Sequence, residues 1–323
     1  MTHFMLKEIH EQPDVIRHLL DRSISIPFQG VDRINILACG TSLHAGLIGQ
    51  FLFEQVAKIP TQVRSSSESL SAPLLETPNT ITIAMTQSGE TADTIAALQT
   101  VRSKRITITN GIDSTITKQV DHTIYIDAGE EKSVAATKTF TAQLVVLYQL
   151  AFELAHQRHQ IDQHEFETNL KLLRRIPEQI EAILKQNTIA QIAKTLKDTR
   201  DLILIASGIN TAIALEGALK LKEVTYTHAE GYAAGEFLHG SIALLDPQIP
   251  TIALLPETAL VRKTVDRIRS NQNHVIEIPT ASFPERFTPF LTVVPLQLLA
   301  HEIAILRKID VDRPRNITKS LTT

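Results

Sequence analysis

The stretch ILACGTSLHAGLIGQFLFEQV, residues 36–56, decides the fold because the chain contains a second copy of it. That copy, LIASGINTAIALEGALKLKEV, occupies residues 204–224 and aligns with the first without a gap. Each copy is an apolar run, a small residue with a glycine, and then a helix-like stretch rich in alanine and leucine. The register pairs Gly40 with Gly208 and Gly49 with Gly217. Such self-similarity predicts two tandem domains of one ancestry.

Short apolar runs alternate with helix-like stretches along both halves of the chain. In the first half we expect strands at 34–38, 62–65, 81–85, 105–109 and 122–126. In the second half we expect strands at 202–206, 250–255 and 274–278. Continuous apolar runs of this kind are typical of parallel strands that are covered on both faces. The sequence therefore predicts an α/β fold with a parallel sheet in each half.

The remaining stretches set the expected domain boundaries. A helix is expected over residues 5–23, and the polar, amphipathic residues 160–198 are expected to form linking helices. The predicted parts are an N-terminal helical segment at 1–30, a first domain at 31–160, linking helices at 161–198, a second domain at 199–305 and a C-terminal tail at 306–323.

Composition argues against several classes of partner and site. The 323 residues are 43% hydrophobic and carry a formal net charge of −3, so no basic excess exists to drive binding to nucleic acid or to an anionic membrane. The first residues lack the apolar segment of a signal peptide, and no transmembrane-length apolar run occurs. The single cysteine, Cys39, cannot form an internal disulfide, which favours a cytoplasmic location. No Cys/His spacing resembles a metal site, and no cofactor is predicted.

Hydroxyl side chains gather at two strand ends of the first half. ACGTS (38–42) and TQSGET (86–91) each continue from an apolar run. Parallel sheets bind ligands at the carboxyl ends of their strands, where helix N-termini offer N–H groups to an anion. We expect a phosphate there, held by backbone N–H groups of residues 88–91 and by the side chains of Thr41, Ser42, Thr86, Gln87, Ser88 and Thr91. We call these six residues the hydroxyl cup.

Two interpretations of the hydroxyl cup are open. Its loops contain no lysine or arginine and lack the Gly-Lys-Thr/Ser ending of a Walker loop, so a phosphate would be held by neutral donors. Alternatively, the serines and threonines only cap helices, and the glycines only turn the chain. Two such loops on one predicted sheet edge favour the phosphate. The counterpart in the second half, LPETAL, has lost the serine and glycine, so no cup is expected there.

Three charged residues are expected on one face of a helix in the second half. Glu216, Lys220 and Glu223 fall at i, i+4 and i+7, among alanine, leucine and glycine. Burying charge is costly unless the charges pair or perform chemistry. The three are therefore either a structural ion pair or a carboxylate placed to move a carbon-bound proton. We call them the ion stripe.

Two further candidates lie outside the predicted helices and strands. His239 stands between small residues in GEFLHG, where its imidazole could either reach a ligand or remain solvated. The tail DVDRPRNITKSLTT has no periodic apolar pattern, so it would either fray or lay Lys319 over a site as a lid.

Taken together, these residues resemble the isomerase domain of the glucosamine-6-phosphate synthases. The resemblance covers nearly the whole chain, through the segments FMLKEIHEQP, ACGTS, TQSGETADT, VAATKTF, ALEGALKLKE, HAEGYAAGE, LHG, DVDRPRN and TKS. It implies two tandem sugar-isomerase (SIS) domains. Each would be a flavodoxin-like three-layer αβα sandwich with a five-stranded parallel sheet.

The resemblance also implies how a substrate is held. The ligand would be a sugar 6-phosphate whose phosphate lies in the hydroxyl cup. The sugar would lie against the backbone near Val134 and Ala136.

The same resemblance implies the catalytic roles. Glu223 would shuttle a proton between C1 and C2, and Lys220 would lie beside the sugar. His239 would assist ring opening in the site of the neighbouring subunit, which implies a homodimer. Lys319 would lie near the carbonyl end of the sugar.

Some features depart from the family pattern. The chain begins where the family's glutamine-hydrolysing domain would end, so we expect amination from glutamine to need a separate glutaminase chain. Lys132 and Ser133 replace an Ile-Gly pair, Leu238 replaces a basic residue, and Ser241 replaces a proline. Residues 206–208 read Ala-Ser-Gly in place of Gly-Arg-Gly. These departures bear on efficiency and on the identity of the sugar.

The predicted function is an aldose–ketose isomerase and aminotransferase acting on fructose-6-phosphate and glucosamine-6-phosphate, in amino-sugar metabolism. The alternative is a glucosamine-6-phosphate deaminase or related deglycase, which would use the same residues in the opposite direction. A third possibility is a non-catalytic SIS protein that senses a sugar phosphate. A sensor would need the hydroxyl cup but would have no use for Glu223, His239 and Lys319 together.

Overall fold

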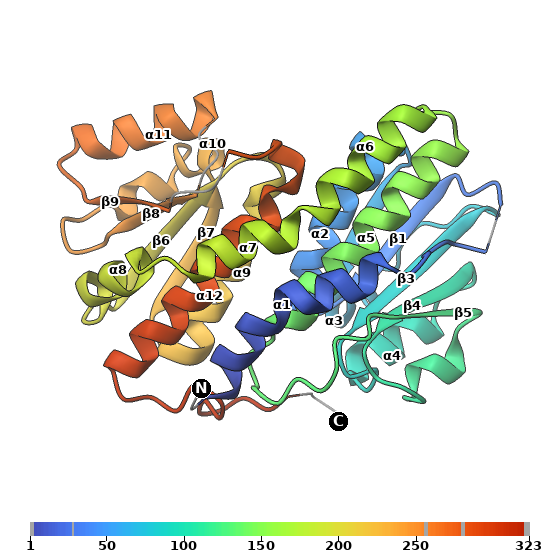
Figure 1. Ribbon diagram of the computed structural model, residues 1–323, viewed down its shortest axis with the longest axis horizontal. Coiled ribbons are helices and arrows are strands. Elements are labelled where there is room, and N and C mark those ends of the chain that lie inside the picture. Colours follow the sequence, from blue (N-terminus) through green and yellow to red (C-terminus); the bar gives the residue numbers. More distant parts are fainter. Residues whose placement is uncertain (1–2, 28, 255–257, 279–281, 320–323) are drawn as a thin grey trace. The chain divides into compact units, whose positions relative to one another are not determined.

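The computed structural model describes residues 3–27, 29–254, 258–278 and 282–319 (Figure 1). The chain divides into two compact units, between which it passes several times. Unit 1 comprises Met1–Pro13, Lys132–Thr137 and Ile176–Ile317. Unit 2 comprises Asp14–Glu131, Lys138–Arg175 and Thr318–Thr323.

Unit 2 contains a five-stranded parallel sheet in the order β2-β1-β3-β4-β5. Its strands are β1 (Arg33–Ala38), β2 (Thr61–Ser65), β3 (Thr80–Thr86), β4 (Lys104–Thr109) and β5 (His122–Tyr125). This is the flavodoxin-like strand order. The chain adds β2 on one side of β1 and then adds β3, β4 and β5 on the other side, so the strand order reverses between β1 and β3. All five predicted strands of the first half are confirmed to within about a residue or two at each end.

Helices cover both faces of this sheet. The long helices α2 (Gly40–Gln55) and α5 (Lys138–Gln157) pack against each other, and α3 (Ser66–Ser69) packs against α4 (Ala92–Gln99). The unit is completed by the short helix η1 (Ile116–Gln119) and by α6 (Gln163–Arg174), which contacts α5. The three-layer arrangement that the sequence predicts is present.

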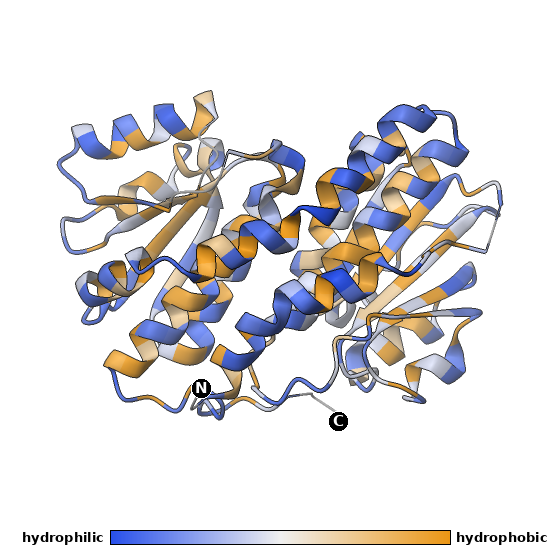
Figure 2. Ribbon diagram, in the orientation of Figure 1, coloured by the Kyte–Doolittle hydropathy of each residue, from blue (hydrophilic) through white to orange (hydrophobic). Residues whose placement is uncertain are grey.

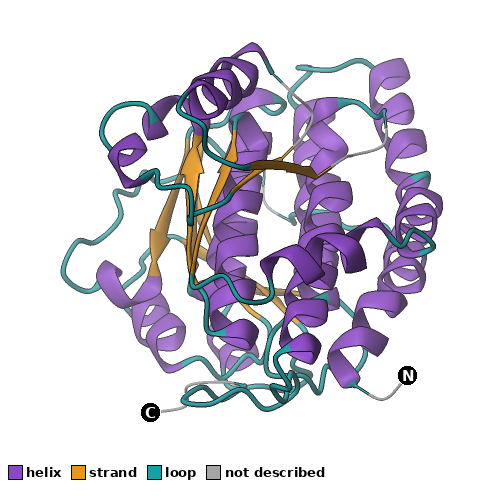
Figure 3. Cartoon of the chain, turned by 90° about the vertical axis from the view of Figure 1, so that its left-hand side faces the viewer, coloured by secondary structure: helices purple, strands orange, loops and turns teal. Residues whose placement is uncertain are grey.

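Unit 1 contains a four-stranded parallel sheet in the order β7-β6-β8-β9. Its strands are β6 (Asp201–Ala206), β7 (His228–Ala233), β8 (Thr251–Leu254) and β9 (Val275–Ile278). Figure 3 shows these strands lying between layers of helices. One face carries α9 (Thr211–Thr225) and α12 (Thr288–Leu306); the other carries α10 (Ala234–Phe237) and α11 (Ala259–Ser270).

The remaining helices of unit 1 are shorter or lie at its edge. α7 (Ile176–Leu184) and α8 (Thr188–Leu196) pack on α12. Single turns lie at η2 (Gly208–Asn210), η3 (Ser241–Leu244) and η4 (Glu285–Phe287).

The second sheet differs from expectation in two ways. It has four strands among the described residues rather than five, and the order matches the first four positions of the other sheet. The strand β7 was not expected, because HAEGYA contains polar residues and a glycine instead of an apolar run. A Cβ atom on Gly231 would lie 2.5 Å from the carbonyl carbon of Ala214, so this strand lies directly against the backbone of α9.

The glycines that coincide in the repeat have matching structural roles. Gly40 and Gly208, which open the helical regions after β1 and β6, both adopt positive φ, at 53° and 56°. A residue with a Cβ atom is strained there. Gly49 and Gly217 let core helices approach closely, because a Cβ atom would lie 2.9 Å from Leu147 and 2.5 Å from Leu296 respectively.

The helices α5 and α12 are the most deeply buried helices of their units. Both are apolar along most of their length, as the orange colouring in Figure 2 shows for α12. The segment Glu285–Leu306 is long and apolar enough to cross a membrane by length and composition alone. However, 83% of its most apolar window is buried inside the structure, which is what a core helix requires.

The first helix, α1 (Phe4–Leu20), is capped by a residue near the other end of the chain. The carboxylate of Asp312 accepts hydrogen bonds from Phe4 N (2.9 Å) and Met5 N (2.8 Å). These are N–H groups of the first helical turn, which have no partner within the helix. The predicted C-terminal tail is thus held by specific contacts. Further along it, Arg315 N donates to the Tyr226 hydroxyl, and the Arg315 guanidinium stacks on the Tyr226 ring.

Candidate active site

The two loops of the hydroxyl cup meet because they follow neighbouring strands. β1 pairs with β3 so that Ala38 lies opposite Met85, and both strands end at the same edge of the sheet. Thr41 and Ser42 lie in the first turn of α2, which starts immediately after β1. Thr86 ends β3, and Thr91 is the residue that precedes α4. The two loops therefore leave the sheet at the same edge.

Hydrogen bonds within the second loop fix its shape. The hydroxyls of Thr86 and Thr91 lie 2.7 Å apart. Gly89 N donates to Thr86 Oγ1 at 3.3 Å, and Glu90 N donates to Ser88 Oγ at 3.1 Å. These two N–H groups were expected to face an anion, and here they donate to the hydroxyls of the loop. Because Ser88 Oγ accepts from the backbone, its own hydrogen can point to a ligand.

A third loop, which follows β4, supports the hydroxyl cup, and it was not predicted from the sequence. Asn110 N donates to Gln87 O (3.0 Å), and Ile116 N donates to Gly89 O (3.1 Å). A Cβ atom on Gly111 would lie 2.2 Å from Ser88 O, so the two backbones are in direct contact. The signal was present as the dipeptide Asn-Gly after a strand, which is typical of a tight turn.

A buried carboxylate in unit 2 holds the predicted C-terminal lysine. Lys319 Nζ lies 2.6 Å from Glu131 Oε2, and the Glu131 side chain is fully buried. Glu131 also accepts from Thr139 N (3.1 Å) and Thr139 Oγ1 (2.7 Å), at the start of α5. The helix N-terminus and the ammonium together compensate the buried charge. Sequence reasoning did not find Glu131, because the pair spans 188 residues.

The ion stripe forms as predicted on α9. Lys220 Nζ lies 3.3 Å from Glu216 Oε1 and 2.6 Å from Glu223 Oε2. The side chains of Lys220 and Glu216 are fully buried, whereas that of Glu223 is 21% exposed. Burial by itself would lower the pKa of Lys220, but the two carboxylates outweigh it and raise that pKa above its ordinary value. Lys220 is therefore a permanent ammonium that holds Glu223 in place.

The substituted pair Lys132-Ser133 has its own support in unit 1. The Glu8 carboxylate of α1 accepts from Lys132 N (2.5 Å) and Ser133 N (3.3 Å). The next residue, Val134, donates its N–H to Asp312 O at 3.2 Å. Ala136 lies two residues further on and is partly buried. The backbone that was predicted to face the sugar is thus held at its N-terminal end by Glu8 and Asp312.

His239 lies in the turn after α10, where its residue is exposed. Its backbone N–H donates to Glu236 O at 2.9 Å. The candidate site residues are divided between the two units. Unit 2 contains the hydroxyl cup and Lys319, and unit 1 contains the ion stripe, His239 and the backbone of Val134 and Ala136.

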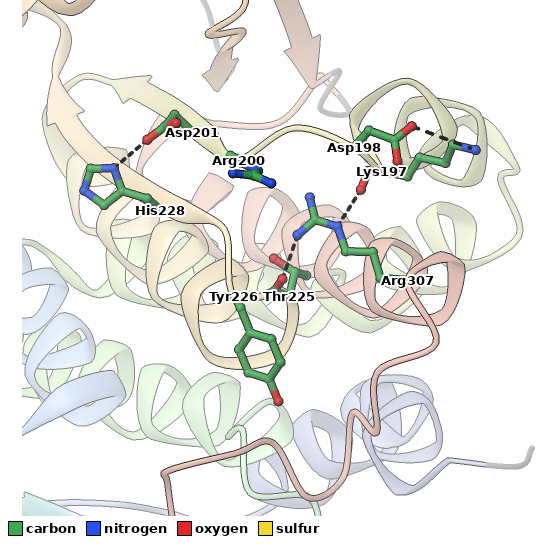
Figure 4. Close-up of a pocket in the computed structure, with 8 residues that line it drawn as sticks. All are labelled: Lys197, Asp198, Arg200, Asp201, Thr225, Tyr226, His228 and Arg307. Atoms are coloured by element: carbon green, nitrogen blue, oxygen red, sulfur yellow. Dashed lines mark hydrogen bonds and ion pairs between the residues drawn. The ribbon is translucent and has the colours of Figure 1, made fainter.

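A hollow elsewhere in unit 1 is lined by charged residues but has a structural explanation. Figure 4 shows it bordered by Lys197, Asp198, Arg200, Asp201, Thr225, Tyr226, His228 and Arg307. The Arg307 guanidinium donates to the carbonyl oxygens of Lys197 and Thr225, at 2.5 and 2.6 Å. Both carbonyls lie at helix C-termini, which attract cations. Arg307 therefore ties the ends of α8 and α9 together.

The described residues contain no group of three or more His, Cys, Asp or Glu side chains that could hold a metal ion.

Comparison with known proteins finds one family and many relatives. Residues 28–152 and 195–282 match the family model of the SIS domain. A glutamine–fructose-6-phosphate aminotransferase [isomerizing] of Synechocystis sp. is 42% identical, over 99% of this chain and 59% of its own length. One of Aquifex aeolicus is 38% identical, over 99% of this chain and 58% of its own length. The chain thus spans a little under three fifths of the curated relatives that it matches.

Two solved structures show how far the similarity extends in space. The C-terminal domain of glucosamine-fructose-6-phosphate aminotransferase from Francisella tularensis superposes with a TM-score of 0.89 at 30% identity, covering 97% of this chain and 99% of that one. A glucosamine-6-phosphate deaminase from Thermotoga maritima superposes with a TM-score of 0.82 at 23% identity, covering 98% and 99%. The second similarity concerns the fold alone.

Proposed function

Because the chain belongs to the SIS-domain family, as a double SIS domain matching the isomerase domain of the glucosamine-6-phosphate synthases, we propose that it is an aldose–ketose isomerase of sugar 6-phosphates. Its substrates are fructose-6-phosphate and glucosamine-6-phosphate, and ammonia supplies the nitrogen at the sugar. The identity of 42% to aminotransferases named as isomerizing supports this choice.

The ion stripe is the observation that carries the proposal. Of its three members, only Glu223 has a side chain with access to solvent, and the buried ammonium of Lys220 fixes its position. A general base must be held within hydrogen-bond reach of the proton that it removes. A purely structural ion pair would not need a third charged group that reaches the surface.

The proposed reaction moves one proton between adjacent carbons. The open-chain ketose, either as its C2 carbonyl or as the C2 imine that it forms with ammonia by losing water, loses a C1 proton to Glu223. The electron pair forms the C1–C2 double bond of an enediol or enolamine, and the C2 oxygen or nitrogen takes up a proton. Glu223 then returns the proton at C2 and the C1 hydroxyl loses its own, so that C1 becomes the aldehyde and C2 carries a hydroxyl or an amine. The hydroxyl cup holds the phosphate during both steps, and Lys319 lies near the carbonyl end. His239 of a neighbouring subunit assists the ring opening that precedes them.

The test is a pair of incubations followed by one substitution. The protein is incubated with glucosamine-6-phosphate, and separately with fructose-6-phosphate plus ammonium or glutamine, and the products are identified. Formation of glucosamine-6-phosphate from fructose-6-phosphate and ammonium is expected. Release of ammonia from glucosamine-6-phosphate without any synthesis would instead identify a deaminase.

Glu223→Gln should abolish turnover in both incubations and leave sugar-phosphate binding nearly unchanged, since the amide cannot accept the proton. The matched control is Glu277→Gln, which removes an exposed carboxylate of the same unit that pairs with Arg269. Full isomerase activity in Glu223→Gln would contradict the role of Glu223. Binding without turnover in the wild-type protein would point to a sugar-phosphate sensor.

A further inference from the structure

The buried glutamine Gln143 contacts the hydroxyl cup from the core helix α5. Its residue is only 1% exposed, and α5 is buried along most of its length. An amide buried in an apolar helix destabilises the fold unless it finds hydrogen bonds. Gln143 Nε2 donates to Ser42 Oγ at 2.9 Å, whereas Gln143 Oε1 is buried with no partner among the described residues. The amide therefore forms a hydrogen bond through its nitrogen, which donates to Ser42, but not through its oxygen.

The orientation of the amide follows from what each alternative leaves over. With Nε2 toward Ser42, one of the two N–H donors is used and the carbonyl oxygen stays without a partner among the described residues. With Oε1 toward Ser42, an NH2 group with two donors would stay buried without an acceptor. Buried donors without partners are rarer in proteins than under-satisfied acceptors. The donating orientation is thus the favoured one.

A donated hydrogen bond fixes the role of the Ser42 hydroxyl. A serine hydroxyl has one hydrogen to give and two lone pairs to receive hydrogens. Since Gln143 fills a lone pair, the hydrogen of Ser42 is left to point to another acceptor. A hydroxyl that already accepts a hydrogen bond is also the stronger donor. Ser42 lies in the first turn of α2, where a helix N-terminus attracts an anion.

We propose that Gln143 is a positioning residue that sets Ser42 as a hydrogen-bond donor toward the phosphate of the substrate. The pairing favours a ligand that only accepts hydrogen bonds, such as a phosphate dianion, over one that would donate to Ser42. This inference rests on the proposed function, because it takes the hydroxyl cup to be the phosphate site.

The test is a double-mutant cycle with Gln143→Met and Ser42→Ala, alone and together. Dissociation constants are measured for inorganic phosphate and for fructose-6-phosphate, with KM and kcat where turnover occurs. Gln143→Met should weaken phosphate binding and raise KM about two- to tenfold, with kcat nearly unchanged. In the Ser42→Ala background it should change nothing further, because the hydroxyl that it orients is gone.

The matched control is Gln149→Met on the same helix. Gln149 is a second buried amide of α5, and its Nε2 donates to Arg22 O at 3.1 Å, away from Ser42. Its loss should leave phosphate affinity unchanged. Equal losses from Gln143→Met with and without the Ser42 hydroxyl would overturn the inference, as would wild-type affinity in Gln143→Met.

A second variant serves if Gln143→Met does not fold. In Gln143→Glu a carboxylate can only accept, so it draws the Ser42 hydrogen away from the ligand, and phosphate binding should fall further. At lower pH the protonated acid can donate again, so the deficit relative to wild type should shrink. A deficit that does not depend on pH would count against the inference.

Failure of the proposed function has a different signature. If the wild-type protein turns over neither sugar but Gln143→Met weakens phosphate binding only when the Ser42 hydroxyl is present, the role of Gln143 would be supported and the isomerase function rejected. A wild-type protein that binds neither phosphate nor fructose-6-phosphate would overturn both.

Discussion

At the scale of single residues, the hydroxyls of the cup should matter for affinity more than for folding. Ser88→Ala and Thr91→Ala each remove a neutral donor to a charged ligand, which should cost about 1.5–3 kcal/mol. That corresponds to a rise in the KM for a sugar 6-phosphate of roughly ten- to a hundredfold. Steady-state kinetics would measure it, and thermal unfolding should change little.

The hydroxyl of Thr100, at the C-terminal end of the helix that Thr91 precedes, provides the control. Thr100 follows α4 and donates to Ala97 O at 2.8 Å, so Thr100→Ala removes a hydroxyl that serves only the helix end. It should leave KM unchanged. If the double variant Ser88→Ala/Thr91→Ala binds the sugar phosphate as well as wild type does, the loop is only a well-formed turn.

At the scale of elements, helix α9 combines a structural and a chemical demand. Lys220→Met removes the ammonium that lies 3.3 Å from the fully buried carboxylate of Glu216. Breaking a buried ion pair in this way should lower the free energy of unfolding of unit 1 by about 3–5 kcal/mol. Urea denaturation followed by circular dichroism would measure the change.

The double variant Glu216→Gln/Lys220→Met separates the two demands. With the buried carboxylate neutralised as well, much of the lost stability should return, because both charges of the buried pair are then removed. Activity should not return, since Glu223 has lost the ammonium 2.6 Å away that positions it. Recovery of both properties together would mean that Lys220 has no part in positioning Glu223.

At the scale of the whole molecule, stability should depend on pH through a buried histidine of α12. Burial lowers the pKa of His301 below its ordinary value of 6.5, and Glu302 only partly opposes this. The folded protein therefore binds fewer protons than the unfolded chain as the pH falls. The contribution of His301 is complete above about pH 6.5 and is lost progressively below it.

His301→Gln should make the loss of stability between pH 7.5 and pH 5.5 shallower, as urea midpoints at the two pH values would show. The titrating and charged groups around His301 are His3, Glu302 and Asp312. Their protonation also contributes to the change in stability between the two pH values. His18→Gln, at an exposed position of α1, is the control and should follow wild type. An unchanged slope in His301→Gln would assign the pH dependence elsewhere.

A second prediction at this scale concerns shared sites. If His239 acts in the site of a neighbouring subunit, Glu223→Gln and His239→Ala variants are inactive alone but complement each other when subunits are mixed. One site of each mixed dimer then contains both native residues. Equal mixing should restore about a quarter of wild-type activity in a twofold dimer. No recovery after verified subunit exchange would place His239 in its own subunit's site.

Most of the fold could be predicted because its strands and helices have recognisable patterns in short stretches of sequence. The strands of unit 2 are continuous apolar runs, and the glycines of the repeat mark positive φ at Gly40 and Gly208. The strand β7 could not be predicted from such runs. Its sequence is shaped by the close approach of Gly231 to Ala214 and carries no apolar pattern.

The same distinction applies to the candidate site. The hydroxyl cup and the ion stripe could be predicted because their members are close in sequence or follow adjacent strands. Glu131 and Gln143 could not, because each acts through a contact with a distant part of the chain. The hydrogen bond from Gln143 to Ser42 spans 101 residues, and no local spacing encodes it.

The cap of α1 by Asp312 has a consequence for the order in which the protein is made. The helix leaves the ribosome well before its cap, which lies 308 residues downstream. At ~5–20 residues per second, translation supplies that carboxylate roughly 15–60 s later. A helix made early in unit 1 is thus among the last parts of that unit to be completed. A chain that ended before Asp312 would contain an α1 helix that never receives its cap.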